Sequence, residues 1–145
     1  MDAPYLQDAP YVNISADPAN GLLSVTWKNF APSGTYRCTL DLAVQWISDL
    51  DLSYFLTDQR RRGAILHDDE LWLIQNWCPR MGRTCLKRAA IVQSPDFFNR
   101  STLERVVESV QSTVPFPIRF FRNPEEALHW LMTGEDLPQI LDVPY

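Results

Sequence analysis

Residues 87–110 read KRAAIVQSPDFFNRSTLERVVESV and combine the signals of one strand and one helix. The apolar run Ala89–Val92, which ends at Ser94-Pro95-Asp96, is typical of a strand buried within a sheet. Further along, Ser101 and Glu104 have the spacing of a capping box, which predicts a helix that begins at Ser101. Apolar residues at three- and four-residue steps give this helix one buried stripe, made of Leu103, Val106, Val107 and Val110.

The same alternation of strands and helices continues on both sides of this unit. In chain order, the sequence predicts a β-hairpin over residues 10–29, a helix over 35–50, a strand over 52–57, a helix over 67–78, a strand over 87–93, a helix over 101–110, a strand over 118–122 and a helix capped by Asn123. Such alternation is typical of a parallel sheet with right-handed crossovers, to which the opening hairpin adds an antiparallel edge. We therefore expect an α/β fold with a mainly parallel sheet.

Length and composition indicate one globular domain. The chain has 145 residues, of which 46% are hydrophobic and 21% charged, as in ordinary globular domains. We place the domain at residues 10–132, between a loose N-terminal lead-in over 1–9 and a C-terminal tail over 133–145.

The charge of the chain is acidic overall but unevenly distributed. A net charge of −5 argues against nucleic-acid binding, which relies on basic side chains to neutralise phosphates. Residues 60–100, however, carry eight basic and four acidic side chains. A local basic patch for an anionic ligand or an acidic partner is therefore one interpretation, and a mixed surface whose charges pair across the fold is the other.

Other composition signals point away from metals, cofactors and membranes. Cys38, Cys78 and Cys85 form no Cys-x-x-Cys motif, so neither a disulfide framework nor a zinc site is indicated. Residues 67–70, which read HDDE, fit the acidic first turn of a helix better than a metal site, and we expect no cofactor. The N-terminus lacks the pattern of a signal peptide, and no apolar run has the length of a membrane span. We expect a cytoplasmic bacterial protein without an integral membrane segment.

Polar residues follow three of the predicted strands at the edge where ligands bind in α/β sheets. The loops that start at Thr57, Ser94 and Arg122 all lie at this edge. The side chains that we expect to meet at a ligand are Asp58, Arg60, Ser94 and Arg122. The run Arg60-Arg61-Arg62 suits a phosphate or a carboxylate, because guanidinium groups bind these anions in a two-point geometry. The alternative is that these residues are polar only because loops are exposed to water.

We assign no catalytic residue from the sequence. The chain has no Gly-x-Ser-x-Gly elbow and no glycine-rich phosphate loop, and Cys78 fits a buried apolar position better than a reactive thiol. Trp46 and Trp130 lie off the main apolar stripes of their helices. We therefore expect both to be partly exposed at an interface with a partner protein or a second copy, the alternative being that they pack against a neighbouring loop.

The order of elements over residues 36–132 resembles the SpoIIAA-like group of STAS-type domains, which includes small stand-alone bacterial proteins. The central strand Tyr54–Asp58 and the closing segment Asn123–Leu131, which reads NPEEALHWL, carry the same resemblance. It implies a sheet wound with helices and a role in binding or regulation. Anti-sigma-factor antagonists of this group carry a phosphorylatable serine after the central strand. This chain has Thr57-Asp58-Gln59-Arg60 there, so the resemblance does not extend to a phosphorylation switch.

The function expected from the sequence is therefore a regulatory or binding module without catalysis, which acts through contacts with another protein or with itself. Two alternatives stay open: a carrier of a small apolar or anionic ligand, and an enzyme that uses the polar residues at the strand ends.

Overall fold

A computed structural model describes residues 5–138 of the chain. Its strands are β1 (Leu6–Asp8), β2 (Val12–Asp17), β3 (Leu22–Trp27), β4 (Tyr54–Asp58), β5 (Arg88–Val92) and β6 (Ile118–Phe121). Its helices are α1 (Ser33–Leu50), α2 (His67–Trp72), the π-helical turn η1 (Leu73–Trp77), α3 (Cys78–Met81), α4 (Phe97–Val110) and α5 (Pro124–Thr133). The predicted tail lies partly within α5, and its residues 139–145 are outside the described residues.

The six strands form one sheet in which spatial order equals chain order, β1-β2-β3-β4-β5-β6. β2 runs antiparallel to its neighbours β1 and β3, and β3 to β6 run parallel to one another. The expected α/β fold, with a parallel sheet after an antiparallel N-terminal hairpin, is confirmed. Among the described residues, no helix has the combination of length and apolar character that crossing a bilayer requires.

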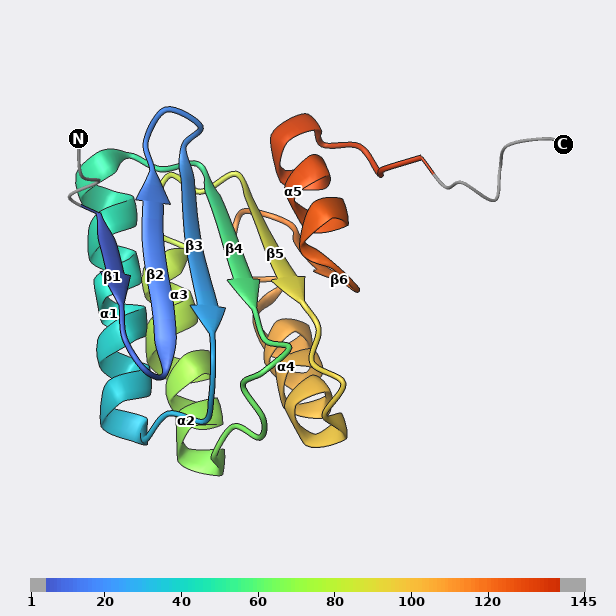
Figure 1. Cartoon of the computed structure of the whole chain (residues 1–145). Helices are drawn as coiled ribbons and strands as arrows, with labels where there is room; N and C mark the ends of the chain where they lie inside the picture. Colours follow the sequence, from blue (N-terminus) through green and yellow to red (C-terminus); the bar gives the residue numbers. More distant parts are fainter. Residues whose placement is uncertain (1–4, 139–145) are drawn as a thin grey trace, which may run out of the picture.

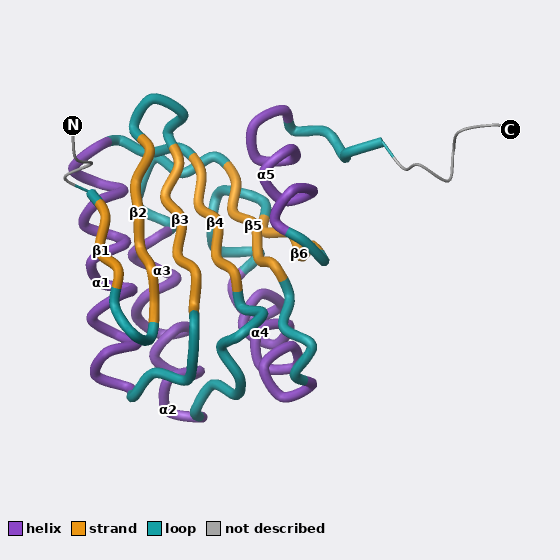
Figure 2. The backbone as a smooth tube through the Cα atoms, viewed as in Figure 1, coloured by secondary structure: helices purple, strands orange, loops and turns teal. Residues whose placement is uncertain are grey.

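The helices lie on both faces of the sheet, but unequally. The crossovers that contain α1, α2 to α3 and α4 all lie behind the sheet in Figure 1, whereas α5 covers the front of β4, β5 and β6. Parallel crossovers share one hand, so a sheet that grows in one direction places every crossover helix on the same face. Figure 2 shows that no helix of the described residues covers the front of β1, β2 and β3.

The core follows the two-residue period of the strands. Val12, Ile14, Leu23 and Val25 point toward the helices behind the sheet and are buried there. On β5 the alternate residues Ala90 and Val92 instead face α5, where a second, smaller core gathers around Phe121, Ala127, Trp130 and Leu131. Because β5 is buried on both faces, its sequence is a continuous apolar run.

Two sequence-based boundaries were wrong. Leu6–Asp8 lies in the predicted lead-in, but it is an edge strand that pairs with Asn13–Ser15 of β2. The helix predicted to begin at Ser101 begins one turn earlier, at Phe97, because the Asp96 side chain accepts a hydrogen bond from the Asn99 amide N–H at 3.0 Å. Asp96 is thus the helix cap, and the capping-box spacing further along lies inside the helix.

The helix predicted over residues 67–78 does not end at its proline. The turn Leu73–Trp77 widens to π geometry, with the Cys78 amide N–H donating to the Leu73 carbonyl, and the chain remains helical to Met81. A proline ring clashes with the carbonyl four residues earlier and offers no N–H to it. The wider turn directly before Pro79 accommodates both effects without breaking the helix.

Candidate functional site

An open cleft of about 700 Å³ lies at the carboxyl edge of the sheet, the end at which β3, β4, β5 and β6 terminate. The four residues that the sequence predicts to meet there all line it. Its wall comes from the ends of four strands and from α4: Thr26, Trp27, Lys28, Asp58, Arg60, Arg61, Gln93, Ser94, Pro95, Arg100 and Arg122. Parallel strands that stop at one edge explain this convergence of distant segments.

Asp58 and Arg60 form a fixed ion pair at the end of β4. The buried Asp58 carboxylate accepts hydrogen bonds from Arg60 Nε at 3.1 Å and Nη2 at 2.8 Å, and from the Arg60 backbone N–H at 3.0 Å. These bonds raise the pKa of the Arg60 guanidinium above its ordinary value. Arg60 therefore presents a positive charge to the cleft, but much of its hydrogen-bonding capacity is already used.

The loop after β5 is held by the first turn of α4. The Ser94 hydroxyl oxygen accepts a hydrogen bond from the Asp96 N–H at 3.0 Å. Arg100, which sequence reasoning did not assign to the site, donates from Nη1 to the carbonyls of Ser94 at 3.2 Å and Pro95 at 2.8 Å. Placing the helix start at Asp96 would have revealed this residue, since Arg100 stands one turn into the helix.

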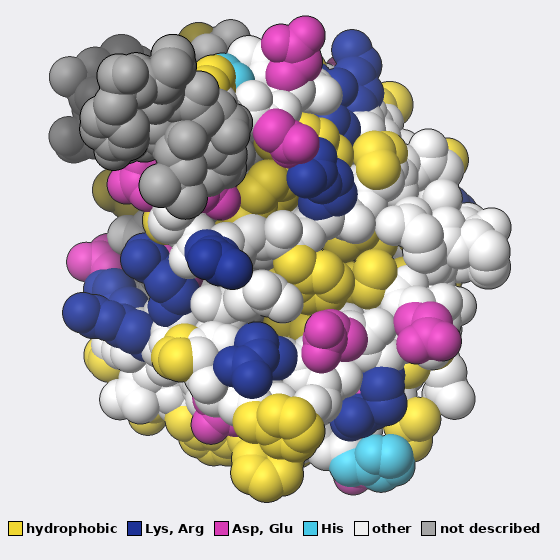
Figure 3. Space-filling model, turned by 90° about the vertical axis from the view of Figure 1, so that its right-hand side faces the viewer, with side chains coloured by type: hydrophobic (Ala, Val, Ile, Leu, Met, Phe, Trp, Pro, Cys, Tyr) yellow, Lys and Arg dark blue, Asp and Glu magenta, His cyan; other side chains and the backbone are white. Residues whose placement is uncertain are grey.

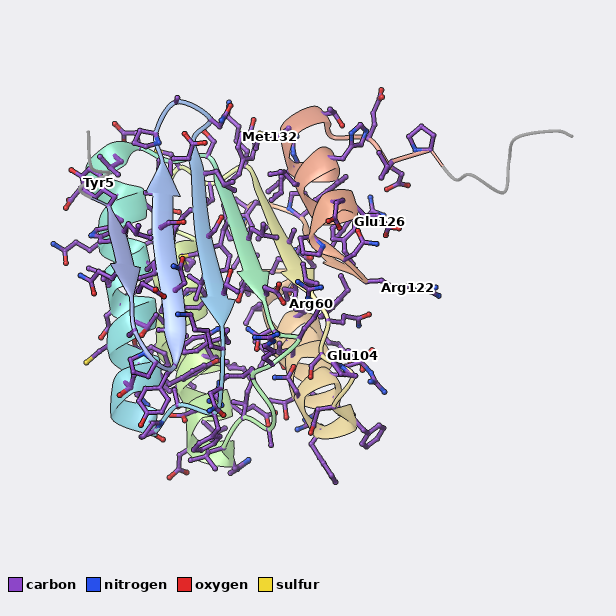
Figure 4. All side chains as sticks on the ribbon, viewed as in Figure 1. Tyr5, Arg60, Glu104, Arg122, Glu126 and Met132 are labelled. Atoms are coloured by element: carbon purple, nitrogen blue, oxygen red, sulfur yellow. The ribbon has the colours of Figure 1, made fainter. Side chains whose placement is uncertain are left out.

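Three arginines at the cleft have no carboxylate partner among residues 5–138: Arg61, Arg100 and Arg122. Lys28, by contrast, forms an ion pair with Asp8 on β1. Arg61 and Arg122 are exposed, and Figure 4 shows that Arg122 extends outward from the end of β6, away from Arg60. The cleft thus combines one arginine fixed by Asp58 with two whose side chains are free to move toward a ligand.

Buried polar side chains tie the loop after β4 to α4. Asn99 donates from Nδ2 to the Gly63 carbonyl at 2.7 Å and to Gln59 Oε1 at 3.2 Å, and Gln59 donates to the Thr57 hydroxyl at 2.9 Å. Asn99 and Gln59 are both buried. This network fixes the loop that presents Arg60 and Arg61, and no local sequence signal distinguishes it from ordinary loop polarity.

The arginine run that the sequence presents as one charged segment is split by the fold. Arg62 is fully buried, with its guanidinium 4.6 Å from the ring centre of Tyr36, 5.0 Å from that of Phe30 and 5.4 Å from that of Trp27. It donates to the Ala64 carbonyl at 3.3 Å, and burial lowers its pKa from the ordinary arginine value. Arg62 therefore anchors the loop from inside and is not available to a ligand.

The expected exposure of the two interface tryptophans was wrong. Trp46 is 7% exposed and packs edge-on against Tyr5, with ring centres 5.4 Å apart. Trp130 is 4% exposed and packs against Phe121 beneath α5. Both lie off the central stripe of their helices but are buried nevertheless. Tyr5, which precedes β1, covers Trp46, and the second core between α5 and the sheet encloses Trp130.

The most exposed aromatic side chains of residues 5–138 stand beside the cleft. Phe97 and Phe98 are 64% and 69% exposed and meet edge to face, with ring centres 5.6 Å apart. They are consecutive residues in the first turn of α4, and adjacent helical positions cannot both point into a core. That signal was present in the sequence, but it was missed because the helix was predicted to begin after both residues.

The interior offers little room for an apolar cargo. A cavity of about 70 Å³ lies between the sheet and the helices behind it, lined by side chains such as Phe55, Trp77, Cys78 and Val106. Pockets that enclose drug-sized ligands are typically about 300–1,000 Å³. This cavity is therefore smaller than the pockets that usually enclose such ligands.

Cysteine labelling should follow this burial. Burial raises the pKa of the Cys78 thiol to about 12, so at neutral pH it stays protonated, whereas Cys38 and Cys85 are exposed. We expect Ellman's reagent to titrate Cys38 and Cys85 in the native protein and Cys78 only in denaturant. The Cys78→Ser variant should titrate like the wild type in its native state. Equal reaction rates for all three thiols would contradict this placement.

The ionisable groups of the cleft are mostly basic. Among residues 5–138, its lining holds one carboxylate, Asp58, which is bound to Arg60, and no histidine or cysteine. Within residues 5–138, no group of His, Cys, Asp and Glu side chains is arranged to hold a metal ion.

No protein-family model matches this chain, and no match was found among curated proteins or among solved structures.

Proposed function

We propose that this domain is a binding module that takes an anionic ligand, bearing phosphate or carboxylate groups, at the carboxyl-edge cleft. The observation that carries the proposal is that Arg61, Arg100 and Arg122 line one cleft without a carboxylate partner among residues 5–138. Guanidinium groups bind such anions through paired hydrogen bonds. In a chain of net charge −5, this local excess of positive charge also steers anions to one edge.

The surrounding structure supports binding over catalysis. The Ser94 hydroxyl is buried and accepts the Asp96 N–H; among the described residues that line the cleft there is no histidine, and the carboxylate of Asp58 is bound to Arg60. A nucleophilic serine needs a base within hydrogen-bond reach. The network of Gln59, Asn99 and Asp96 holds the two ligand-facing loops in one arrangement, as recognition of a ligand requires.

We further propose that the domain is SpoIIAA-like and acts in regulation. Supporting features are the opening hairpin, the strictly sequential parallel strands and the closing helix α5 on the opposite face. The loop after β4, where that group carries its phosphorylatable serine, here presents Asp58 paired with Arg60. The regulation that we propose therefore depends on ligand binding and not on phosphorylation of this loop.

The proposal is tested by isothermal titration calorimetry with inorganic pyrophosphate as the probe, at low and at high salt. We expect the Arg61→Ala/Arg122→Ala variant to bind pyrophosphate at least tenfold more weakly than the wild type, because two charge-assisted contacts are lost. Thermal stability should stay nearly unchanged, since both side chains are exposed and form no ion pair with residues 5–138.

A matched control removes the same charge elsewhere. Arg83 and Lys87 are exposed, form no ion pair with described residues and lie before β5, away from the carboxyl edge. The Arg83→Ala/Lys87→Ala variant should bind pyrophosphate like the wild type. Equal weakening in both variants would mean that only the overall charge attracts the anion, and the proposed cleft would then be rejected.

A further inference from the structure

We infer that the loops at the carboxyl edge dock this protein onto a membrane surface that contains anionic phospholipid. The inference rests on the proposed function, because the cleft would receive the phosphate of a lipid headgroup. The inference adds to the proposed function that the anion belongs to a lipid headgroup, and that exposed apolar side chains contact the lipid as well. The occupant is a lipid surface, to which the protein would bind without spanning it.

Exposed apolar side chains gather at the loops of this edge. Phe30 precedes α1 and is 43% exposed, and Leu66 precedes α2 and is 46% exposed. Phe97 and Phe98 open α4 and are the most exposed large apolar side chains among the described residues. All three helices begin at the lower end of the sheet in Figure 1, so the residues that precede or open them lie at one end of the molecule.

These side chains are exposed, and none of the four lines the apolar cavity, the basic cleft or two further open clefts of the described surface. A partner helix or peptide would need a groove to enclose its own apolar residues. Exposed apolar side chains on neighbouring loops suit a fluid interface instead, because such side chains partition into the headgroup region of a bilayer.

Arginine side chains at this end can contact an anionic surface. In Figure 3, Lys and Arg side chains, with Asp and Glu side chains among them, stand above a hydrophobic group at the lower edge of the face. Arg61 and Arg100 come from the loop before α2 and from α4 itself, so they share the elements that carry the exposed apolar residues. Cations near an anionic bilayer are attracted to it, and this attraction would turn the carboxyl edge of an otherwise acidic molecule toward the lipid.

The experiment is flotation of the full chain with vesicles of phosphatidylcholine alone, or of phosphatidylcholine with about one third phosphatidylserine. We expect the wild type to float only with the anionic vesicles, and less as salt is added. Phe97→Ser/Phe98→Ser should lower the affinity by about a hundredfold, since two apolar side chains lose their burial. Arg61→Ala/Arg122→Ala should lower it by about thirtyfold.

The control variant is Leu6→Ser/Leu128→Ser, which removes two exposed leucines on β1 and α5, outside the loops of this edge. It should float like the wild type. Calorimetry with pyrophosphate separates the two proposals, because Phe97→Ser/Phe98→Ser should leave pyrophosphate binding intact. A wild type that binds pyrophosphate but does not float overturns the membrane inference and leaves an acidic protein as the occupant of this edge. Normal flotation of Phe97→Ser/Phe98→Ser overturns it as well.

Discussion

Replacing Trp130 with alanine is expected to lower the free energy of unfolding by about 3–5 kcal/mol. The indole is 4% exposed and, with Phe121, Ala127 and Leu131, forms the core between α5 and the sheet. Removing it leaves a cavity that this small core cannot close, because the other face of β5 is itself buried in the main core. Urea unfolding followed by circular dichroism measures the loss.

The control for this prediction lies on the same helix. Leu128 is 40% exposed, and its replacement by alanine should change stability by less than about 0.5 kcal/mol. The pair also tests the earlier expectation that Trp130 belongs to an interface. A Trp130→Ala protein that keeps its full stability but changes its mass in sedimentation would restore that expectation and contradict the core assignment.

The second large effect is expected at Arg62, whose replacement by alanine should cost about 3 kcal/mol of stability. The fully buried side chain fills the space between Trp27, Phe30 and Tyr36 and carries favourable contacts of its charge with their rings. Its loss would also release the loop that presents Arg61 to the cleft. We therefore expect Arg62→Ala to weaken pyrophosphate binding, although Arg62 is not among the residues that line the cleft.

A methionine at the same position separates packing from charge. Arg62 Nε and Nη2 have no hydrogen-bond partner among the described residues, so the charge is buried at a cost that methionine would remove. Arg62→Met should keep most of the volume and lose less than about 1 kcal/mol in the same urea experiment. If methionine costs as much as alanine, the guanidinium charge itself, and not the volume, stabilises this site.

Much of the fold could be predicted because its strands are buried and regularly spaced by helices. The apolar run at Ala89–Val92 and the stripe of α4 leave few alternatives to a parallel βα unit. The misplaced elements depend on contacts that local patterns do not contain. β1 is three residues long, and its pairing with Asn13–Ser15 requires a tertiary neighbour. The π turn before Pro79 forms because the helix accommodates a proline without ending, while the side chains around it stay packed. Local sequence patterns do not predict this outcome.

The candidate site was predictable to the level of its place. Strand polarity alone brought Asp58, Ser94 and Arg122 to one edge, and the structure places them in one cleft. Sequence could not separate Arg61 from Arg62, because adjacent arginines differ only in the direction that a loop gives them. The prediction that Trp46 and Trp130 are exposed was wrong for a related reason. Helical periodicity identifies the central apolar stripe of a helix but not which elements cover the flanks of that stripe.

The sequential strand order has a consequence for how the chain can fold during its synthesis. Each strand pairs with the strand translated just before it, so no strand has to be inserted later between two that are already paired. Contacts between segments close in sequence favour fast folding. The sheet can therefore extend strand by strand as the chain leaves the ribosome, and α5, translated last of the elements, closes the second core once β4, β5 and β6 are in place.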